Sequence, residues 1–276
     1  MEITMIAAVI FILALAARRR HAFALRWQPT RHTWAAVGAG LLAFVLSALL
    51  LLFKDSSVAH RLLHYGGIYV LCGVLIPWGY PLLIEKNTDA SIGLTRERWG
   101  ISLILNGVLG GLFALILIFE ADWGAIEPVA FTRATLVLLV GTLFELLLYY
   151  GFIHLRLEQA FGTIPAILGT AVLYVLWHAG TQLPHEPDLL IGIVKLFAVG
   201  VLYQSVFSLT HNLLAIWPCF LGVGVMIDYA VNIETIDPVS AQLPWAVGAL
   251  ACMLLTGSLI YLRSHTLEAL ATPSPG

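Results

Sequence analysis

The sequence predicts an all-α protein, a polytopic transmembrane helical bundle of 8–9 helices with an intramembrane cavity. Hydrophobic residues make up 60% of the 276 residues, and charged residues only 11%. The mean hydropathy of +0.92 lies well outside the range of ordinary soluble domains. Apolar stretches of about 20 residues, long enough to cross the hydrocarbon layer, recur along the chain.

The first expected span is short and is followed by a basic cluster, Arg18 to Arg20. A secretory signal has its basic residues before the apolar run, so this segment is predicted to be a retained anchor. Because the first span is short, the predicted helix count is eight or nine. The expected spans cover residues 3–17, 33–53, 66–84, 99–119, 132–153, 163–182, 189–209, 213–231 and 243–262.

The connections are too short to hold a separate soluble domain, so residues 1–276 are predicted to form a single transmembrane domain. Residues 264–276 are expected to be a disordered tail. Glycines within the fourth span, such as Gly107, Gly110 and Gly111, are predicted to allow close helix packing.

The positions of Lys and Arg predict an N-terminus outside and a C-terminus inside. In that orientation the outer loops contain only Lys54, Arg61 and Arg133, while Lys195 lies within a span. The inner loops contain Arg18, Arg19, Arg20, Arg26, Arg31, Lys86, Arg96, Arg98, Arg156 and Arg263. Chain size and short loops lead us to expect an integral, multi-pass protein of a prokaryotic cytoplasmic membrane.

Neither charge nor cysteine content indicates a nucleic-acid partner or a disulfide framework. The net charge is −2, and the basic cluster after the first span is interpreted as a topology determinant. Cys72, Cys219 and Cys252 fall in three different apolar stretches, without the paired spacing of a disulfide or a thiolate metal site.

An acidic residue, Glu145, interrupts the fifth span, and His178 lies in the sixth. A carboxylate at mid-bilayer costs roughly 2.5–3.5 kcal/mol, so intramembrane acids usually have a polar cavity or a partner. Both residues lie about 25 Å from the connection at Gly162 along antiparallel helices, so they are expected to share a depth. Arg156 and Glu158, just before this connection, are expected at the cytosolic interface.

A carboxylate and an imidazole at one level can together bind a water. The carboxylate can take a proton from that water, and the ring can orient the water or later donate a proton. The residues alone are equally consistent with a structural role, in which Glu145 pairs with His178 or Lys195 and holds the helices together.

Residues 145–152 (ELLLYYGF), followed by Leu155 and Leu157, resemble the first motif, E-E-x-x-x-R-G, of the CPBP family. This family contains the CAAX-processing and bacteriocin-processing type intramembrane glutamic proteases. Residues 174–178 (YVLWH) resemble the second motif, F-x-x-x-H, and residues 91–96 (SIGLTR) resemble the G-L-x-R entry found upstream. The similarity covers about residues 90–230, as a CPBP-like core.

The resemblance implies an all-helical bundle with a conical cavity, in which Glu145 activates a water and His178 holds that water and shuttles the proton. Tyr149, Tyr150 and Tyr174 lie within these motifs as possible supporting residues. The family chemistry requires no cofactor and no metal. Glu145, His178 and His211 could in principle hold zinc, but we do not expect them to do so.

The sequence departs from the family pattern at several positions. Leu146 replaces the second glutamate and Tyr150 replaces the arginine, so the ion pair that would brace the first motif is missing. Residues 210–218 (THNLLAIWP) resemble the segment before the fourth motif, and counting on places Gly222 and Met226 where the family has His and Asn. Those two residues stabilise the oxyanion, and losing one such donor can cost 10² to 10³ in rate.

His211 and Asn212 are the obvious substitutes for the missing donors. Their position at the cytosolic start of the eighth span places them about two to three helical turns from the expected level. We therefore favour an N-cap role for Asn212, with His211 at the interface. Lys195 is either a functional intramembrane cation or a snorkelling side chain, and Asp228 is expected at the outer interface.

Three functions remain open at this stage. The first is an intramembrane endopeptidase that hydrolyses a peptide bond of a membrane-associated or lipidated substrate. The second is a catalytically inactive pseudoprotease of the same fold, which binds a peptide or a partner membrane protein. The third is a carrier that uses Glu145, His178 and Lys195 as an ion relay. The expected partners are thus a peptide or membrane-protein substrate and membrane lipid.

Overall fold

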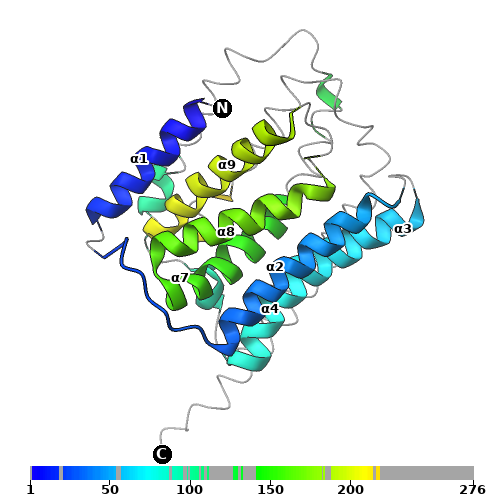
Figure 1. Ribbon diagram of the computed structural model, residues 1–276, viewed down its shortest axis with the longest axis horizontal. Coiled ribbons are helices and arrows are strands. Elements are labelled where there is room, and N and C mark those ends of the chain that lie inside the picture. Colours follow the sequence, from blue (N-terminus) through cyan, green and yellow to red (C-terminus); the bar gives the residue numbers. More distant parts are fainter. Residues whose placement is uncertain are drawn as a thin grey trace, which may run out of the picture.

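A computed structural model gives the arrangement of the helices (Figure 1). It describes residues 2–18, 21–53, 57–86, 89–95, 98, 100–105, 107–108, 111, 127–129, 132, 141–181, 183, 188–213 and 216–217. Every regular element within these residues is a helix, in agreement with the predicted all-α class.

The first half of the chain contributes α1 (Glu2–Arg18), α2 (Arg31–Leu50) and a long helix with several segments. That long helix consists of α3 (Val58–Arg61), η1 (Leu62–Leu75), α4 (Ile76–Tyr80) and η2 (Pro81–Glu85), in which η1 and η2 are of the wider π type. A short 3₁₀ turn, η3 (Asp89–Ile92), follows. The second half contributes η4 (Leu146–His154, π type), α7 (Leu155–Phe161), α8 (Thr163–Trp177), η5 (His178–Gly180) and α9 (Leu189–Thr210).

Local sequence signals explain where these helices begin and end. The Thr30 side chain accepts a hydrogen bond from the Thr33 backbone N–H, and the Thr33 hydroxyl accepts one from the Thr30 backbone N–H. These two bonds form a capping box for α2. The Asp188 carboxylate accepts from two backbone N–H groups at the start of α9. Gly162 has φ +97 between α7 and α8, and a Cβ there would lie 2.4 Å from the Ala24 carbonyl oxygen, so this turn requires glycine.

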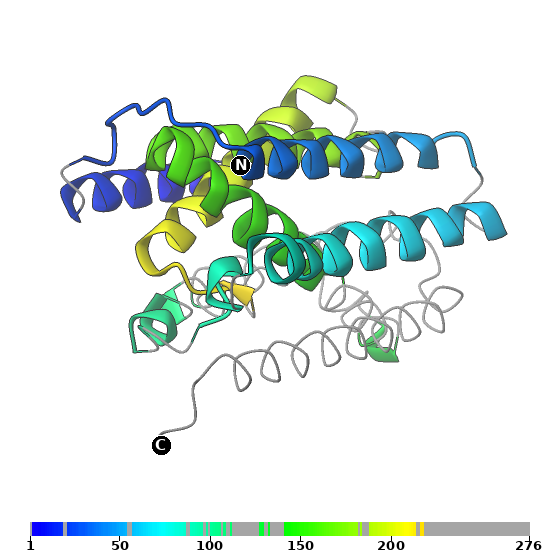
Figure 2. The ribbon, with the colours of Figure 1, turned by 90° about the horizontal axis from the view of Figure 1, so that it is seen from below.

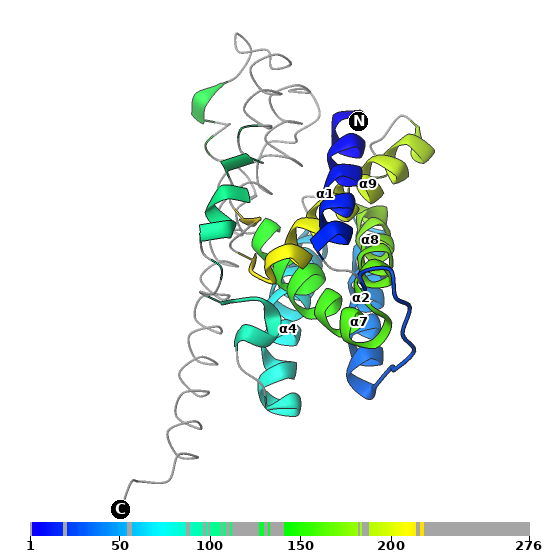
Figure 3. The same ribbon diagram turned by 90° about the vertical axis from the view of Figure 1, so that its left-hand side faces the viewer.

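The helices pack in the order α1, α9, α8, α2 and η1, each against the next. Figure 2 shows α2 running beside the η1 segment, and Figure 3 shows α8 and α9 together with α1 alongside α9. The η4 helix contacts α8, α2, η1 and α9, and all nine of its residues are buried. The segment that follows Glu145 is therefore the central element of the described fold.

Within the described residues, four helices are long and apolar enough to cross a membrane: Arg31–Leu50, Val58–Glu85, Thr163–Gly180 and Leu189–Thr210. Met5–Arg18 is a shorter apolar helix. The predicted count of eight or nine helices is not confirmed. The expected span at 243–262, most of the spans at 213–231 and 99–119, and residues 133–140 of the span at 132–153 lie outside the described residues.

Candidate active site

Glu145 and Tyr174 approach each other across the interface between two helices. Glu145 precedes η4, and Tyr174 lies in α8 with only 4% of its surface exposed. The Tyr174 hydroxyl donates a hydrogen bond of 3.5 Å to Oε2 of Glu145. This long contact links the predicted acid to the first residue of the YVLWH segment.

His178 lies one helical turn after Tyr174, and its ring is held from several directions. Its Nδ1 is 3.0 Å from the Tyr174 carbonyl oxygen. A carbonyl can only accept, so Nδ1 carries a proton in this arrangement and Nε2 of a neutral ring is the acceptor. The rings of Tyr174 and Trp177 contact the imidazole edge-on, at centroid distances of 4.5 and 4.4 Å. Glu145 and His178 are thus both attached to Tyr174, which connects the two predicted residues.

Helix α2 fixes the end of α8 at this histidine. The Ser47 hydroxyl donates a hydrogen bond to the Trp177 carbonyl and accepts one from the Gly180 backbone N–H at 3.3 Å. A Cβ at Gly180 would lie 1.7 Å from the Ser47 carbonyl oxygen, so only glycine allows this contact. The sequence offers no motif for this support.

Further aromatic residues surround the carboxylate. The Tyr149 ring packs edge-on against Tyr174 at 5.8 Å, and Glu145 is within electrostatic range of the hydroxyls of Tyr69, Tyr149 and Tyr150. The sequence analysis named Tyr149 and Tyr150 but missed Tyr69, which belongs to η1 and has no counterpart in the motifs. The Tyr149 hydroxyl and Trp177 Nε1 are buried and have no hydrogen-bond partner in the described part of the chain.

An ion pair different from the motif pair braces this helix. Leu146 and Tyr150, which replace the motif Glu and Arg, are both fully buried. The Arg156 guanidinium instead makes a two-point contact with Glu85, with Nε–Oε1 at 2.8 Å and Nη2–Oε2 at 2.5 Å. It also donates to the Phe152 carbonyl at 2.9 Å and lies 4.1 Å from the centre of that ring.

Arg156 is only 4% exposed, so its guanidinium is packed among the helices. Its charge is compensated by Glu85, whose carboxylate is also 3.5 Å from His32 Nδ1.

His211 lies with Glu158 rather than with Glu145. As the C-cap of α9 it has φ +53, and its Nε2 is 2.6 Å from Glu158 Oε2. The Thr163 hydroxyl donates to the other carboxylate oxygen at 2.6 Å. Burial raises the pKa of Glu158, but the His211 hydrogen bond, with the nearby charge of His154 and the Thr163 hydroxyl, outweighs it and lowers this pKa to about 2.

Two residues that the sequence analysis missed extend this cluster. His154, fully buried in η4, has its Nε2 2.9 Å from the Ser208 hydroxyl and 3.9 Å from Glu158 Oε2. The pattern HxxxE at residues 154–158 places both side chains on one helix face and could have indicated this pair.

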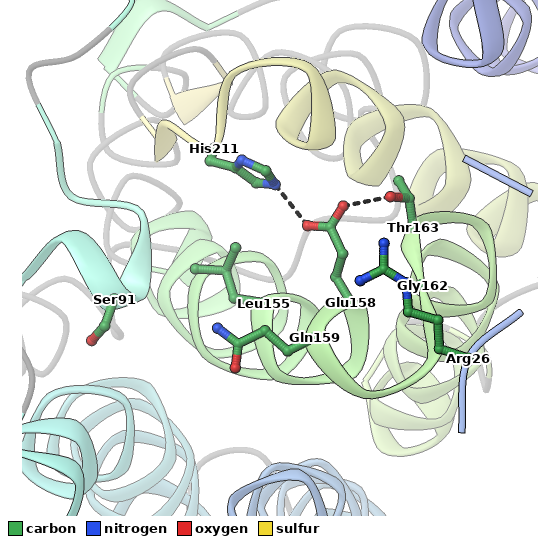
Figure 4. A pocket seen from close by; sticks show the side chains of 8 residues that line it. All are labelled: Arg26, Ser91, Leu155, Glu158, Gln159, Gly162, Thr163 and His211. Carbon is green, nitrogen blue, oxygen red and sulfur yellow. Dashed lines mark hydrogen bonds and ion pairs between the residues drawn. The ribbon is translucent and has the colours of Figure 1, made fainter. Parts of the chain in front are cut away.

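A pocket of about 450 Å³ opens beside the Glu158 cluster. Figure 4 shows the hydrogen bonds from Glu158 to His211 and Thr163 at this pocket, with Arg26 nearby. It is lined by Arg26, Ser91, Leu155, Glu158, Gln159, Gly162, Thr163 and His211. Glu145 is not among these residues. The described pocket thus lies at the α7–α8 turn, about 20 Å along the helix from Glu145.

The other candidate residues have separate environments. Asn212 is fully buried, and its backbone N–H donates to the Thr210 hydroxyl at 3.2 Å. Lys195 is partly buried on α9. Gly222, Met226 and Asp228 lie outside the described residues, as does any helix that Asn212 would cap. Among the described residues, His, Cys, Asp and Glu form no group of three that could hold a metal ion.

Comparison with protein families identifies the segment that carries both motifs. Residues 126–225, a little over a third of the chain, match the model described as type II CAAX prenyl endopeptidase Rce1-like. This segment is Rce1-like. The match confirms the resemblance to the CPBP family, and the family it names is one of proteases. No curated protein and no solved structure matches the chain significantly.

Proposed function

We propose that this protein is an intramembrane endopeptidase that hydrolyses a peptide bond of a membrane-associated or lipidated substrate. The observation that carries the proposal is the attachment of Glu145 and His178 to a single residue, Tyr174. The Rce1-like match over residues 126–225 supports the same reaction class. Tyr149 and Tyr150 are proposed as supporting residues of the aromatic wall around the carboxylate.

In the proposed reaction, the Glu145 carboxylate takes a proton from a water, and the hydroxide oxygen attacks the peptide carbonyl carbon. The C–N bond then breaks as the proton passes to the leaving amine, which yields a carboxylic acid and an amine. Because His178 donates from Nδ1 to the Tyr174 carbonyl, its Nε2 can accept a hydrogen bond from the water. Tyr174 is a positioning residue, since it contacts both the acid and the histidine. The mechanism uses no metal and no cofactor.

The proposed test is peptide cleavage by the purified full-length protein in liposomes, with a panel of prenylated and unprenylated peptides. Glu145→Gln should abolish cleavage while leaving the fold intact, because the amide keeps the size of the side chain. Glu127→Gln is the matched control, since Glu127 is exposed and far from the motifs in sequence. Cleavage that persists in Glu145→Gln would refute the role of this residue.

A pseudoprotease is the second candidate, and a specific observation favours it. Leu146 and Tyr150 stand where the family motif has Glu and Arg, and both are fully buried. In that case the wild-type protein would cleave no peptide of the panel but would bind one of them saturably.

The proposed orientation has the N-terminus outside and the C-terminus inside, which places the α7–α8 turn and its pocket on the cytosolic side.

A further inference from the structure

Polar side chains continue through the buried interior between the Glu145 site and the Glu158 pocket. On α9, Gln204 and Ser208 are four residues apart and share one helix face, and His211 follows as the C-cap of the same helix. On α8, Thr170 lies one turn from Tyr174 in the direction of Thr163. Helices α8 and α9 pack closely, so the two polar rows lie along one interface.

At both ends of this line of polar residues, side chains are joined by direct hydrogen bonds. At one end, the Tyr174 hydroxyl donates to Glu145 at 3.5 Å. At the other, the Ser208 hydroxyl is 2.9 Å from His154 Nε2, and Glu158 bonds to His211 at 2.6 Å beside the pocket. Between these ends, the described residues make no direct side-chain hydrogen bonds at Thr170 and Gln204.

The middle of this line contains polar groups that have no partner among the described residues. Gln204 is fully buried, and neither its Nε2 nor its Oε1 makes a hydrogen bond to any residue that the structure describes. The hydroxyl of Thr170 is likewise fully buried and has no partner. Buried amides and hydroxyls are nearly always hydrogen-bonded, to protein or to ordered water. Three unpaired polar atoms along one interface therefore indicate bound water.

The packing of Gly200 places Gln204 within one helical turn of the level of Thr170. A Cβ at Gly200 would lie 3.2 Å from Ala171 and 3.4 Å from Tyr174 Cδ1, so these positions face each other. Because the helices are antiparallel, Gln204, four residues further along α9, lies level with Ile167, and Thr170 lies between that level and Ala171 on α8. One helical turn rises about 5.4 Å, a distance that two hydrogen bonds of about 2.8 Å span with one water between them.

We propose that a line of bound water, held by Thr170 and Gln204, connects the Glu145 site with the Glu158–His211 pocket. This inference goes beyond the proposed cleavage activity. Hydrolysis consumes one water per peptide bond, and this route supplies water from the pocket through the protein interior. Ser208 and His154 form the passage between the pocket and Gln204. Tyr174 forms the passage between Thr170 and Glu145.

Cysteine accessibility tests the proposal in the full-length protein without any peptide. Cys72, Cys219 and Cys252 are first replaced by Ala, and Gln204→Cys and Thr170→Cys are made separately in that background. The probe is 2-aminoethyl methanethiosulfonate, which reacts with the thiolate form of cysteine. A thiol ionises to the thiolate only where water contacts it. Val206→Cys is the control, because Val206 is equally buried on the same helix. Labelling at Gln204→Cys should be at least about tenfold faster than at Val206→Cys.

A second measurement uses the natural side chains. Hydroxyl radicals generated in bound water by an X-ray pulse should oxidise Tyr174 in the wild-type protein. Gln204→Leu keeps the volume of the side chain but removes its hydrogen bonds, so oxidation of Tyr174 should fall several-fold. Oxidation of Phe152, which is fully buried in η4 away from this line, should not change.

The two measurements have clear opposing outcomes. Labelling of a folded Gln204→Cys within twofold of Val206→Cys would overturn the proposal. If the cysteine variants do not fold, an unchanged oxidation of Tyr174 in Gln204→Leu would overturn it. Neither result bears on whether Glu145 cleaves peptides, and a failure of the cleavage test would leave the water line standing.

Discussion

Removal of the Arg156 guanidinium should destabilise the protein more than an ordinary surface substitution. Arg156 and Glu85 form a two-point ion pair whose side chains are 5% and 7% exposed. Arg156→Met keeps the apolar stem but leaves the Glu85 carboxylate buried, with His32 Nδ1 at 3.5 Å as a weaker partner. Breaking a buried ion pair from one side costs about 3–5 kcal/mol, so we expect a loss in this range.

A double-mutant cycle isolates the ion pair from lost packing. Replacement of both charges, in Arg156→Met with Glu85→Met, removes the uncompensated carboxylate. The double variant should therefore be more stable than Arg156→Met alone, although it carries more substitutions. The free energy of unfolding is measured by denaturant titration in mixed micelles, with tryptophan fluorescence as the signal.

Arg26→Met is the matched control, since Arg26 is exposed and should change stability by no more than about 0.5 kcal/mol. The reasoning fails if Arg156→Met costs less than about 1 kcal/mol. It also fails if the effects of the two single substitutions add within about 0.5 kcal/mol, because an interacting pair must deviate from additivity.

Two further changes test the packing and the charges around the site. Gly180→Ala should prevent the end of α8 from docking on α2, because the new Cβ would lie 1.7 Å from the Ser47 carbonyl oxygen. We expect a loss of folded protein in size-exclusion chromatography. A normal yield of stable protein would contradict this prediction. The folded-state pKa of Glu158 is lowered from 4.5 to about 2, so its stabilisation is complete above pH 4.5 and is lost as pH falls toward 2. The loss of stability is about 3 kcal/mol at most. It should be smaller in His211→Leu, as measured by acid unfolding. Equal pH dependence of stability in the wild type and His211→Leu would refute the pairing of Glu158 with His211.

Apolar length alone predicted several helices closely. The expected spans 163–182 and 189–209 correspond to Thr163–Gly180 and Leu189–Thr210, because spans of this kind are fixed by bilayer thickness. The third span begins at Val58 rather than at 66. His60 and His64 lower the hydropathy of this stretch, although both lie in the helix, where their rings pack edge-on at 5.8 Å.

The candidate site was predicted where its residues follow one another along a helix. Tyr174 and His178 are four residues apart in one motif, and Glu145 carries a charge that an apolar span makes conspicuous. The supporting contacts could not be predicted, because their partners are distant in sequence. Arg156 and Glu85 are separated by 71 positions, and Ser47 and Gly180 by 133. A single sequence contains no signal for such pairs.

The departures from the family motif have different consequences for catalysis. The motif Glu and Arg would brace the helix that carries the acid, and Arg156 with Glu85 braces that same helix from two turns further along. Leu146 and Tyr150 therefore do not by themselves predict that Glu145 is misplaced.

His211 does not replace the missing oxyanion donors in the same way. It is bound to Glu158, about 20 Å from Glu145 along the helix. Two buried donors that have no hydrogen-bond partner among the described residues lie in the same aromatic cluster, the Tyr149 hydroxyl and Trp177 Nε1. The rings of Tyr149 and Trp177 are 6.4 Å apart. A developing oxyanion needs donors that are in place before the reaction and unused by other groups, and each is worth 10² to 10³ in rate. The choice between an enzyme and a binding protein thus depends on these donors more than on the lost Glu–Arg pair.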